Sequence, residues 1–237
     1  MSQLPLFFTH SLVSDQVLLT GDDARHCFRV LRLREGDEIR MTDGYGNAGT
    51  AKILDTNIDR CVAIITRRDE IQNRSLNIHI GISPLKNVDR FEWFIEKATE
   101  LGVSKITPIL TARTEKTAIK TERLEKIIIS GLKQSGQYWK PTLSAPVSFD
   151  KYLDEHTECQ RFIAYCEDKP PLHLANSCLK VKDVSLLIGP EGDFTMNEVE
   201  KALSKNYTMV SLGENRLRTE TAGIVAVEIV HIINSIV

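Results

Sequence analysis

Long hydrophobic runs are missing from this sequence, which excludes a membrane-spanning helix. No apolar run reaches the roughly 18 residues that such a helix needs. The first residues, MSQLPLFFTHSLVSDQ, also lack the basic segment and the long apolar segment of a secretory signal. The composition, with 42% hydrophobic and 26% charged residues, is that of a globular protein. We therefore expect a cytoplasmic protein with no membrane partner.

Metal-binding and disulfide patterns are missing as well. The sequence has an odd number of cysteines, five, and no two of them have C-x-x-C spacing. No histidine belongs to an H-E-x-x-H motif. We expect no metal site, and we expect free thiols in a reducing compartment. The cysteines are Cys27, Cys61, Cys159, Cys166 and Cys178.

The chain also lacks a strong overall charge, since its formal net charge is −2. One stretch differs: residues 113–140 hold seven basic side chains against three acidic ones. Because phosphates are neutralised locally, such a patch is sufficient for binding RNA. A solvated helix face is the alternative interpretation of the same charges.

The N-terminal third is typical of short strands separated by turns. Residues 36–43, 48–55 and 60–67 have strand composition, with turn residues between them. This pattern predicts a small β-barrel or sandwich. The interrupting stretch 23–37 is rich in arginine, whose planar fork suits phosphate and base contacts. A short amphipathic helix that caps the barrel is the alternative for this stretch.

The pattern changes after the polar segment 67–75, which we expect to be the domain boundary. Strands then alternate with helices, and this alternation predicts an α/β domain with a mostly parallel sheet. Asn87 and the capping box Thr195-x-x-Glu198 mark two helix starts. The expected strands are 76–82, 105–110, 161–166, 184–188 and 208–212, and the expected helices are 87–102, 121–138, 195–206 and 221–237.

Two glycine-rich segments follow buried strands of the expected sheet. The first is Gly189-Pro190-Glu191-Gly192-Asp193-Phe194, and the second begins at Gly213 and continues through RLRTETA. Ligands of open α/β sheets bind at the carboxyl ends of strands, so both segments are candidates for a binding site. Neither matches G-x-G-x-x-G or a Walker A sequence. From the residues alone, two structural turns are an equally good interpretation.

Taken together, these segments resemble the signature of the RsmE family of SPOUT-class methyltransferases. GPEGDF is followed by LG-x-x-RLRTETA, while Arg25-His26 with VLRLREGD, PLK at 84–86, EKATELGV at 96–103 and ITPIL before Arg113 match further family motifs in the right order. The resemblance implies methylation of uridine N3 in 16S ribosomal RNA with S-adenosylmethionine as cofactor. The substrate would be the free RNA or the small ribosomal subunit.

The resemblance also implies an architecture. Residues 1–72 would form a PUA-like RNA-binding β-barrel. Residues 73–237 would form a SPOUT domain whose C-terminal segment makes a trefoil knot, an exception to the usual rules of chain connection. Members of the family are homodimers, and the apolar helix expected at 221–237 is a candidate for the interface.

Site residues follow from the matched positions. The cofactor would be held by Ile188, Gly189, Pro190, Gly192, Leu212, Gly213, Leu217, Arg218 and Thr221. Glu191, Arg218 and Glu220 are the candidates for catalysis, as a base or as a group that stabilises the uridine anion. The alternatives are structural roles. Glu191 would then only fix its turn, and Glu220 would only pair with Arg218 or cap the last helix. RNA would be contacted by Arg25, His26, Arg29, Arg32, Arg113 and Lys116.

Some positions depart from the family pattern. Asp193 stands where a second glycine is frequent, Arg216 where an aliphatic residue is frequent, and Lys133 and Gln137 where glutamate and arginine are frequent. Three other functions stay open. They are a SPOUT methyltransferase for another RNA such as transfer RNA, a non-catalytic RNA-binding protein, and an unrelated α/β enzyme for a small nucleotide.

Overall fold

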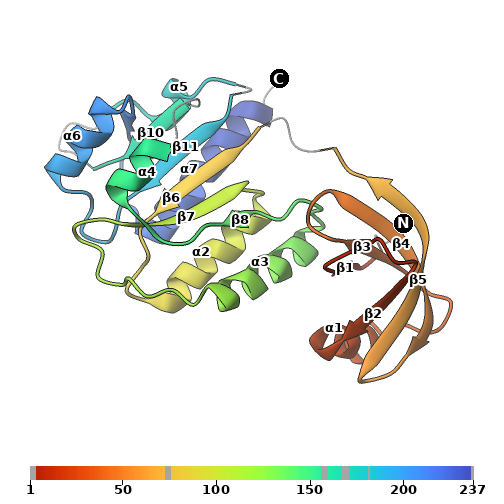
Figure 1. Ribbon diagram of the computed structural model, residues 1–237. Coiled ribbons are helices and arrows are strands. Elements are labelled where there is room, and N and C mark those ends of the chain that lie inside the picture. Colours follow the sequence, from red (N-terminus) through yellow and green to blue (C-terminus); the bar gives the residue numbers. More distant parts are fainter. Residues whose placement is uncertain (1–3, 73–75, 156–159, 167–170, 181, 236–237) are drawn as a thin grey trace. The chain divides into compact units, whose positions relative to one another are not determined.

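Two β-sheets organise the chain in the computed structural model, which describes residues 4–72, 76–155, 160–166, 171–180 and 182–235. One unit holds Met1–Asn73 with Ile129–Lys140, and the other holds Arg74–Ile128 with Pro141–Val237. Figure 1 shows the five-stranded sheet of the first unit and the larger sheet of the second. Helix α3 (Thr121–Ser135) contributes to both units.

The sheet of the first unit has the strand order β1-β3-β4-β5-β2. Its strands are β1 (Leu6–Phe8), β2 (Gln16–Thr20), β3 (Glu38–Thr42), β4 (Asn47–Thr56) and β5 (Arg60–Glu70). Strand β1 pairs in parallel with β3, and the remaining pairs are antiparallel. Alternate residues of β2 are buried, so one face of the sheet covers an apolar core. The three expected strands are confirmed, whereas β1 and β2 were not predicted.

The arginine-rich stretch of the first unit is helical. It forms α1 (Gly21–Arg25) and then a π-helical turn, η1 (His26–Val30). Within this segment Ala24 and Cys27 are buried, while Arg25 and Arg29 are exposed. The expected short amphipathic helix is therefore present, and it leaves the arginines available to a ligand.

Residues 129–140 belong to the first unit because of specific contacts. The Lys133 ammonium lies 2.6 Å from the Asp23 carboxylate. The Trp139 indole N–H donates to the carbonyl of Ile71 at 3.1 Å. Lys133, which departs from the family pattern, is therefore occupied by an ion pair within the protein.

All strand pairs described in the sheet of the second unit are parallel, and the sequence predicts a mostly parallel sheet. Its order is β12-β10-β11-β6-β7-β8, with β9 also paired to β7. The strands are β6 (Ile78–Ile82), β7 (Lys105–Leu110), β8 (Thr142–Leu143), β9 (Val147–Ser148), β10 (Gln160–Ala164), β11 (Val184–Ile188) and β12 (Thr208–Val210). Strand β10 lies between β11 and β12, so the two strands that precede the glycine-rich segments are not direct neighbours. The α/β class is confirmed, and the trefoil knot stays a prediction.

The helices of the second unit follow their sequence signals with small differences. They are α2 (Val88–Glu100), α4 (Phe149–Glu155), α5 (Leu174–Ser177), α6 (Met196–Ser204) and α7 (Thr219–Ser235), in addition to α3. Asn87 caps α2 by accepting from the amides of Asp89 and Arg90, as predicted. Val88, the first residue of α2, is 43% exposed, whereas Phe94 is fully buried in the core. No helix within the described ranges is long and apolar enough to cross a membrane.

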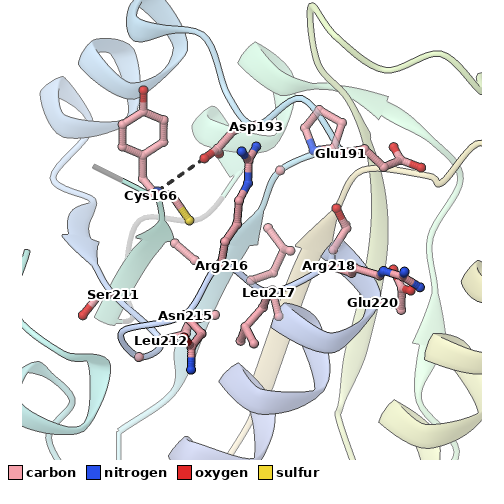
Figure 2. A pocket seen from close by; sticks show the side chains of 18 of the residues that line it. Cys166, Glu191, Asp193, Ser211, Leu212, Asn215, Arg216, Leu217, Arg218 and Glu220 are labelled. Carbon is pink, nitrogen blue, oxygen red and sulfur yellow. Dashed lines mark hydrogen bonds between the residues drawn. The ribbon is translucent and has the colours of Figure 1, made fainter. Parts of the chain in front are cut away.

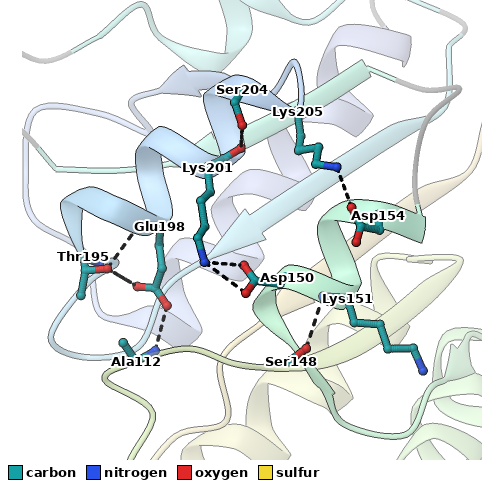
Figure 3. Close-up of polar contacts among 10 residues, drawn as sticks. All are labelled: Ala112, Ser148, Asp150, Lys151, Asp154, Thr195, Glu198, Lys201, Ser204 and Lys205. Atoms are coloured by element: carbon teal, nitrogen blue, oxygen red, sulfur yellow. Dashed lines mark hydrogen bonds and ion pairs between the residues drawn. The ribbon is translucent and has the colours of Figure 1, made fainter.

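Helix α6 begins with the predicted capping box, which also ties it to another part of the fold. The Glu198 carboxylate accepts from the amide and hydroxyl of Thr195 at 2.8 and 2.9 Å. Its other oxygen accepts from the amide of Ala112 at 2.8 Å, in the loop after β7. Figure 3 shows this cluster, together with the ion pairs from Lys201 and Lys205 to α4.

Replacement of this buried carboxylate should lower stability. We expect Glu198→Ala to reduce the free energy of unfolding by about 2 kcal/mol, because the cap is lost and the Ala112 amide is left without its acceptor. Glu200→Ala, at an exposed position of the same helix, is the control and should change it by less than about 0.5 kcal/mol. Urea unfolding of both variants measures the difference, and equal midpoints would contradict this role of Glu198.

Candidate active site

A cavity of about 540 Å³ lies at the carboxyl ends of β10, β11 and β12. The loops that follow these strands supply nearly all of its lining, through residues 164–166, 188–191, 193, 210–220 and 222. Figure 2 shows these side chains around the opening. The sequence predicted the loops after β11 and β12, and the structure adds the end of β10 between them.

The loop after β11 approaches its own chain closely at Gly189. A side chain there would meet the Phe194 ring at 3.1 Å and an Asp193 carboxylate oxygen at 3.2 Å. The turn is closed by the Asp193 amide, which donates to the Pro190 carbonyl at 2.9 Å. Glycine at 189 therefore allows the loop to fold tightly at the end of the strand.

The loop after β12 leaves open space at Gly213. Its φ is +145°, which side chains rarely allow, and no atom lies within 4 Å of the place where a Cβ would stand. The apolar residues Ile188, Leu212 and Leu217 line the same cavity. An apolar wall beside exposed main-chain groups is typical of a small-molecule site.

Three charged candidates lie on one side of the cavity. Figure 2 shows Glu191, Arg218 and Glu220 there, opposite Cys166 and Asp193. Arg218 is exposed, and its carbonyl accepts the amide of Ala222 at the start of α7.

The two carboxylates of this group have different surroundings. Glu220 is in the first turn of α7, with a side chain only 10% exposed, and it lies 3.7 Å from the guanidinium of Arg90. Its described ion pair is therefore with Arg90 and not with Arg218. Glu191 is exposed and accepts from the amide of Lys86 at 3.2 Å. Arg90 lines the cavity too, although no motif of the sequence pointed to this residue.

The opposite side of the cavity carries Asp193, Cys166 and Arg216. Asp193 accepts from the amides of Phe194 at 2.8 Å and Cys166 at 3.3 Å, which joins the loops after β11 and β10. Burial raises the pKa of the Asp193 carboxyl above its ordinary value, and the hydrogen bonds and the charge of Arg216 oppose this. Burial also raises the pKa of the Cys166 thiol.

Two expected cofactor residues, Gly192 and Thr221, do not line the cavity. Gly192 instead contacts Arg113, whose guanidinium donates to the carbonyls of Gly192 and Phe194. Arg113 therefore anchors the loop after β11, and its contact with RNA stays a prediction. Lys116 is half-buried in the segment that leads to α3.

The other expected RNA residues lie together in the first unit. Arg25 pairs with Asp22 at 3.1 Å, and the His26 ring packs edge-on against Phe7. Arg29 and Arg32 are exposed. In the described part of the chain, no group of three or more potential ligand side chains is arranged to hold a metal ion.

Two family descriptions match the chain. The RNA methyltransferase domain matches residues 72–231, which is more than half of the chain, and the RNA methyltransferase PUA domain matches residues 19–66. The ribosomal RNA small subunit methyltransferase E of Rickettsia conorii is 28% identical, with 94% of this chain and 92% of the relative covered. The protein of the same name from Synechocystis is 29% identical, with 91% and 72% covered.

Solved structures of similar proteins point to the same family. A Porphyromonas gingivalis protein described as a probable rRNA-methyltransferase has a TM-score of 0.89 at 38% identity, with 98% of this chain and 99% of that chain covered. The ribosomal RNA small subunit methyltransferase E of Neisseria gonorrhoeae, bound to S-adenosyl methionine, has a TM-score of 0.86 at 29% identity, with 98% of each chain covered. The chain therefore belongs to the family of ribosomal RNA small subunit methyltransferase E.

Proposed function

We propose that this chain transfers a methyl group from S-adenosylmethionine to N3 of a uridine in 16S ribosomal RNA. The observation that carries the proposal is the glycine-lined cavity at three parallel strand ends, with Glu191, Arg218 and Glu220 on one side. In this proposal residues 1–72 bind RNA as a PUA-like barrel, and residues 73–237 form the methyltransferase domain. The solved Neisseria relative, which is bound to the same cofactor, supports the assignment.

The residues of the cavity fit an adenosine group. Its volume of about 540 Å³ falls in the range of small-molecule sites, about 300–1,000 Å³. Ile188, Leu212 and Leu217 offer an apolar wall to the flat base, and the open position at Gly213 gives access to main-chain polar groups. The fit thus rests on the shape and the composition of the loops.

The side chains around the cavity suit methyl transfer to a weakly acidic nitrogen. S-adenosylmethionine, when bound, supplies an electrophilic methyl group on a sulfonium. Uracil must lose its N3 proton, and in this proposal the guanidinium of Arg218, which lines the cavity, stabilises the resulting negative charge on the uracil oxygens. Either Glu191 or Glu220 accepts this proton in the proposed reaction. Alignment of N3 with the methyl group supplies much of the remaining rate acceleration.

Assembly and location complete the proposal. Helix α7 keeps several apolar side chains only half-buried, among them Ile224 and Ile229, and Ile232 is exposed. Apolar side chains that stay partly exposed along one helix suit an interface, so we place the contact of a homodimer on this helix. A ribosomal substrate places the enzyme in the cytoplasm.

The activity is tested with labelled S-adenosylmethionine and small subunits or 16S RNA that lack the modification. The proposal predicts 3-methyluridine in digests analysed by mass spectrometry. Transfer only to transfer RNA would instead favour another RNA target, and cofactor binding without any transfer would favour a non-catalytic RNA-binding protein. Both outcomes would contradict the proposed reaction.

Filling the cavity should abolish cofactor binding without unfolding the chain. Gly213→Trp places a large side chain in the open space beside the apolar wall, so calorimetry should detect no binding of S-adenosylmethionine. Gly36→Trp is the matched control, because its φ is +93° and its Cβ would meet only Lys52 at 3.8 Å. The control carries a similar backbone strain in the first unit and should bind normally. Normal binding by Gly213→Trp would show that the site lies elsewhere.

Removal of the Arg218 charge should slow the reaction more than it weakens cofactor binding. We expect Arg218→Gln to lower kcat at least tenfold while the Kd for S-adenosylmethionine changes by less than about threefold, because the charge acts on the RNA base. Lys205→Gln, which removes a cation just after the end of α6 and outside the cavity, should leave both values unchanged. An unchanged kcat for Arg218→Gln would remove this residue from the mechanism.

The exposed arginines of the first unit should contribute to RNA affinity through phosphate. Arg29→Gln and Arg32→Gln should each weaken binding and reduce the slope of log K against log salt concentration by about one. Arg60→Gln is the control, because Arg60 is also exposed but pairs with Asp55 at 3.0 Å. Filter binding of 16S RNA fragments at several salt concentrations measures the slopes. Equal slopes for all three variants would place the RNA contact elsewhere.

A further inference from the structure

Two side chains of opposite charge, Asp193 and Arg216, lie on the side of the cavity away from the three catalytic candidates. They come from different loops, after β11 and after β12, so the fold alone brings them together. Figure 2 shows the Arg216 side chain extending toward Asp193, beside Cys166. The charge of Arg216 is close enough to lower the pKa of Asp193. Both residues are departures from the pattern that the sequence resembles.

Hydrogen bonds to neighbouring amides accompany an unusual backbone conformation at Asp193. Its φ is +62°, a conformation that favours glycine and that aspartate tolerates through local hydrogen bonds. Those bonds are present, from the amides of Phe194 and Cys166. A carboxylate has about four acceptor positions, so the described amides leave acceptor capacity for a ligand in the cavity.

The electrostatic setting of this carboxylate favours a cationic ligand. Burial raises the pKa of Asp193, which means that its negative charge lacks part of the solvation it would have in water. A bound cation would restore that stabilisation. Arg216 is exposed and can point its planar set of donors toward an anion beside the carboxylate.

We propose that Asp193 and Arg216 recognise the zwitterionic amino-acid end of the cofactor. Asp193 accepts hydrogen bonds from the α-ammonium group, and Arg216 donates to the α-carboxylate. The protein offers a carboxylate beside a guanidinium, and the amino-acid end of the cofactor carries an ammonium and a carboxylate on one carbon atom. The two pairs of charges are therefore complementary. The inference rests on the proposed function, because it takes this cavity to be the cofactor site. It makes these two residues the determinants that distinguish the whole cofactor from its nucleoside part.

Two thioether ligands isolate this recognition. S-adenosylhomocysteine and 5′-methylthioadenosine share the adenosine and a neutral sulfur, but only the first carries the α-ammonium and α-carboxylate groups. Titration calorimetry should show that the unaltered protein prefers S-adenosylhomocysteine by roughly ten- to hundredfold.

The variants test which residues carry the preference. Asp193→Asn and Arg216→Leu should each weaken S-adenosylhomocysteine about tenfold and leave 5′-methylthioadenosine nearly unchanged. Arg216→Lys should recover part of the loss, because it restores the positive charge.

Controls separate charge recognition from damage to the loops. Glu214→Gln removes a negative charge from the same cavity and should keep the preference. Thermal unfolding checks that each variant is folded, and 5′-methylthioadenosine reports on the shape of the adenosine pocket. A preference that survives both Asp193→Asn and Arg216→Leu, or that is lost in Glu214→Gln alone, overturns the inference and leaves the cofactor site standing. Failure of both ligands to bind the unaltered protein overturns the proposed function itself.

Discussion

The parallel register of three neighbouring strands is the constraint on which the site depends. Ala164, the last residue of β10, is the register partner of both Ile188 on β11 and Val210 on β12. Because the strands run in the same direction, their three following loops begin at one level of one sheet edge. Segments far apart in the chain therefore surround one cavity, and each loop needs only a few residues to reach it. The apolar strands beneath are buried, so this edge rests on a packed core.

Hydrogen bonds from side chains hold these loops in position. Glu198 fixes the amide of Ala112, and the next residue, Arg113, donates to two carbonyls of the loop after β11. Asp193 then joins that loop to the end of β10. A path of hydrogen bonds thus runs from the start of α6 to the cavity wall. Preorganisation of this kind lowers the cost of ordering a loop when a ligand binds.

Local signals in the sequence predicted the elements well, because caps and buried strands depend on nearby residues. Asn87, the Thr195 capping box and the apolar strands 184–188 and 208–212 are examples. The order of the strands was not predictable in this way, since it depends on how the whole sheet buries its faces. For the same reason the sequence did not reveal the pairing of Arg90 with Glu220, or of Lys133 with Asp23. The family signature indicated methyl transfer and the loops that line the cavity. The structure showed that Gly192 and Thr221, two of the expected cofactor residues, do not line it.

The central claim is that the three loops after β10, β11 and β12 form the site of the cofactor. A crystal structure of the chain with S-adenosylhomocysteine tests it most directly. The account predicts the adenosine against Ile188, Leu212 and Leu217, and the amino-acid end between Asp193 and Arg216. The sulfur would then face the side of Glu191, Arg218 and Glu220. Ligand density at any other place on the chain, or an amino-acid end that points away from both Asp193 and Arg216, would contradict the account.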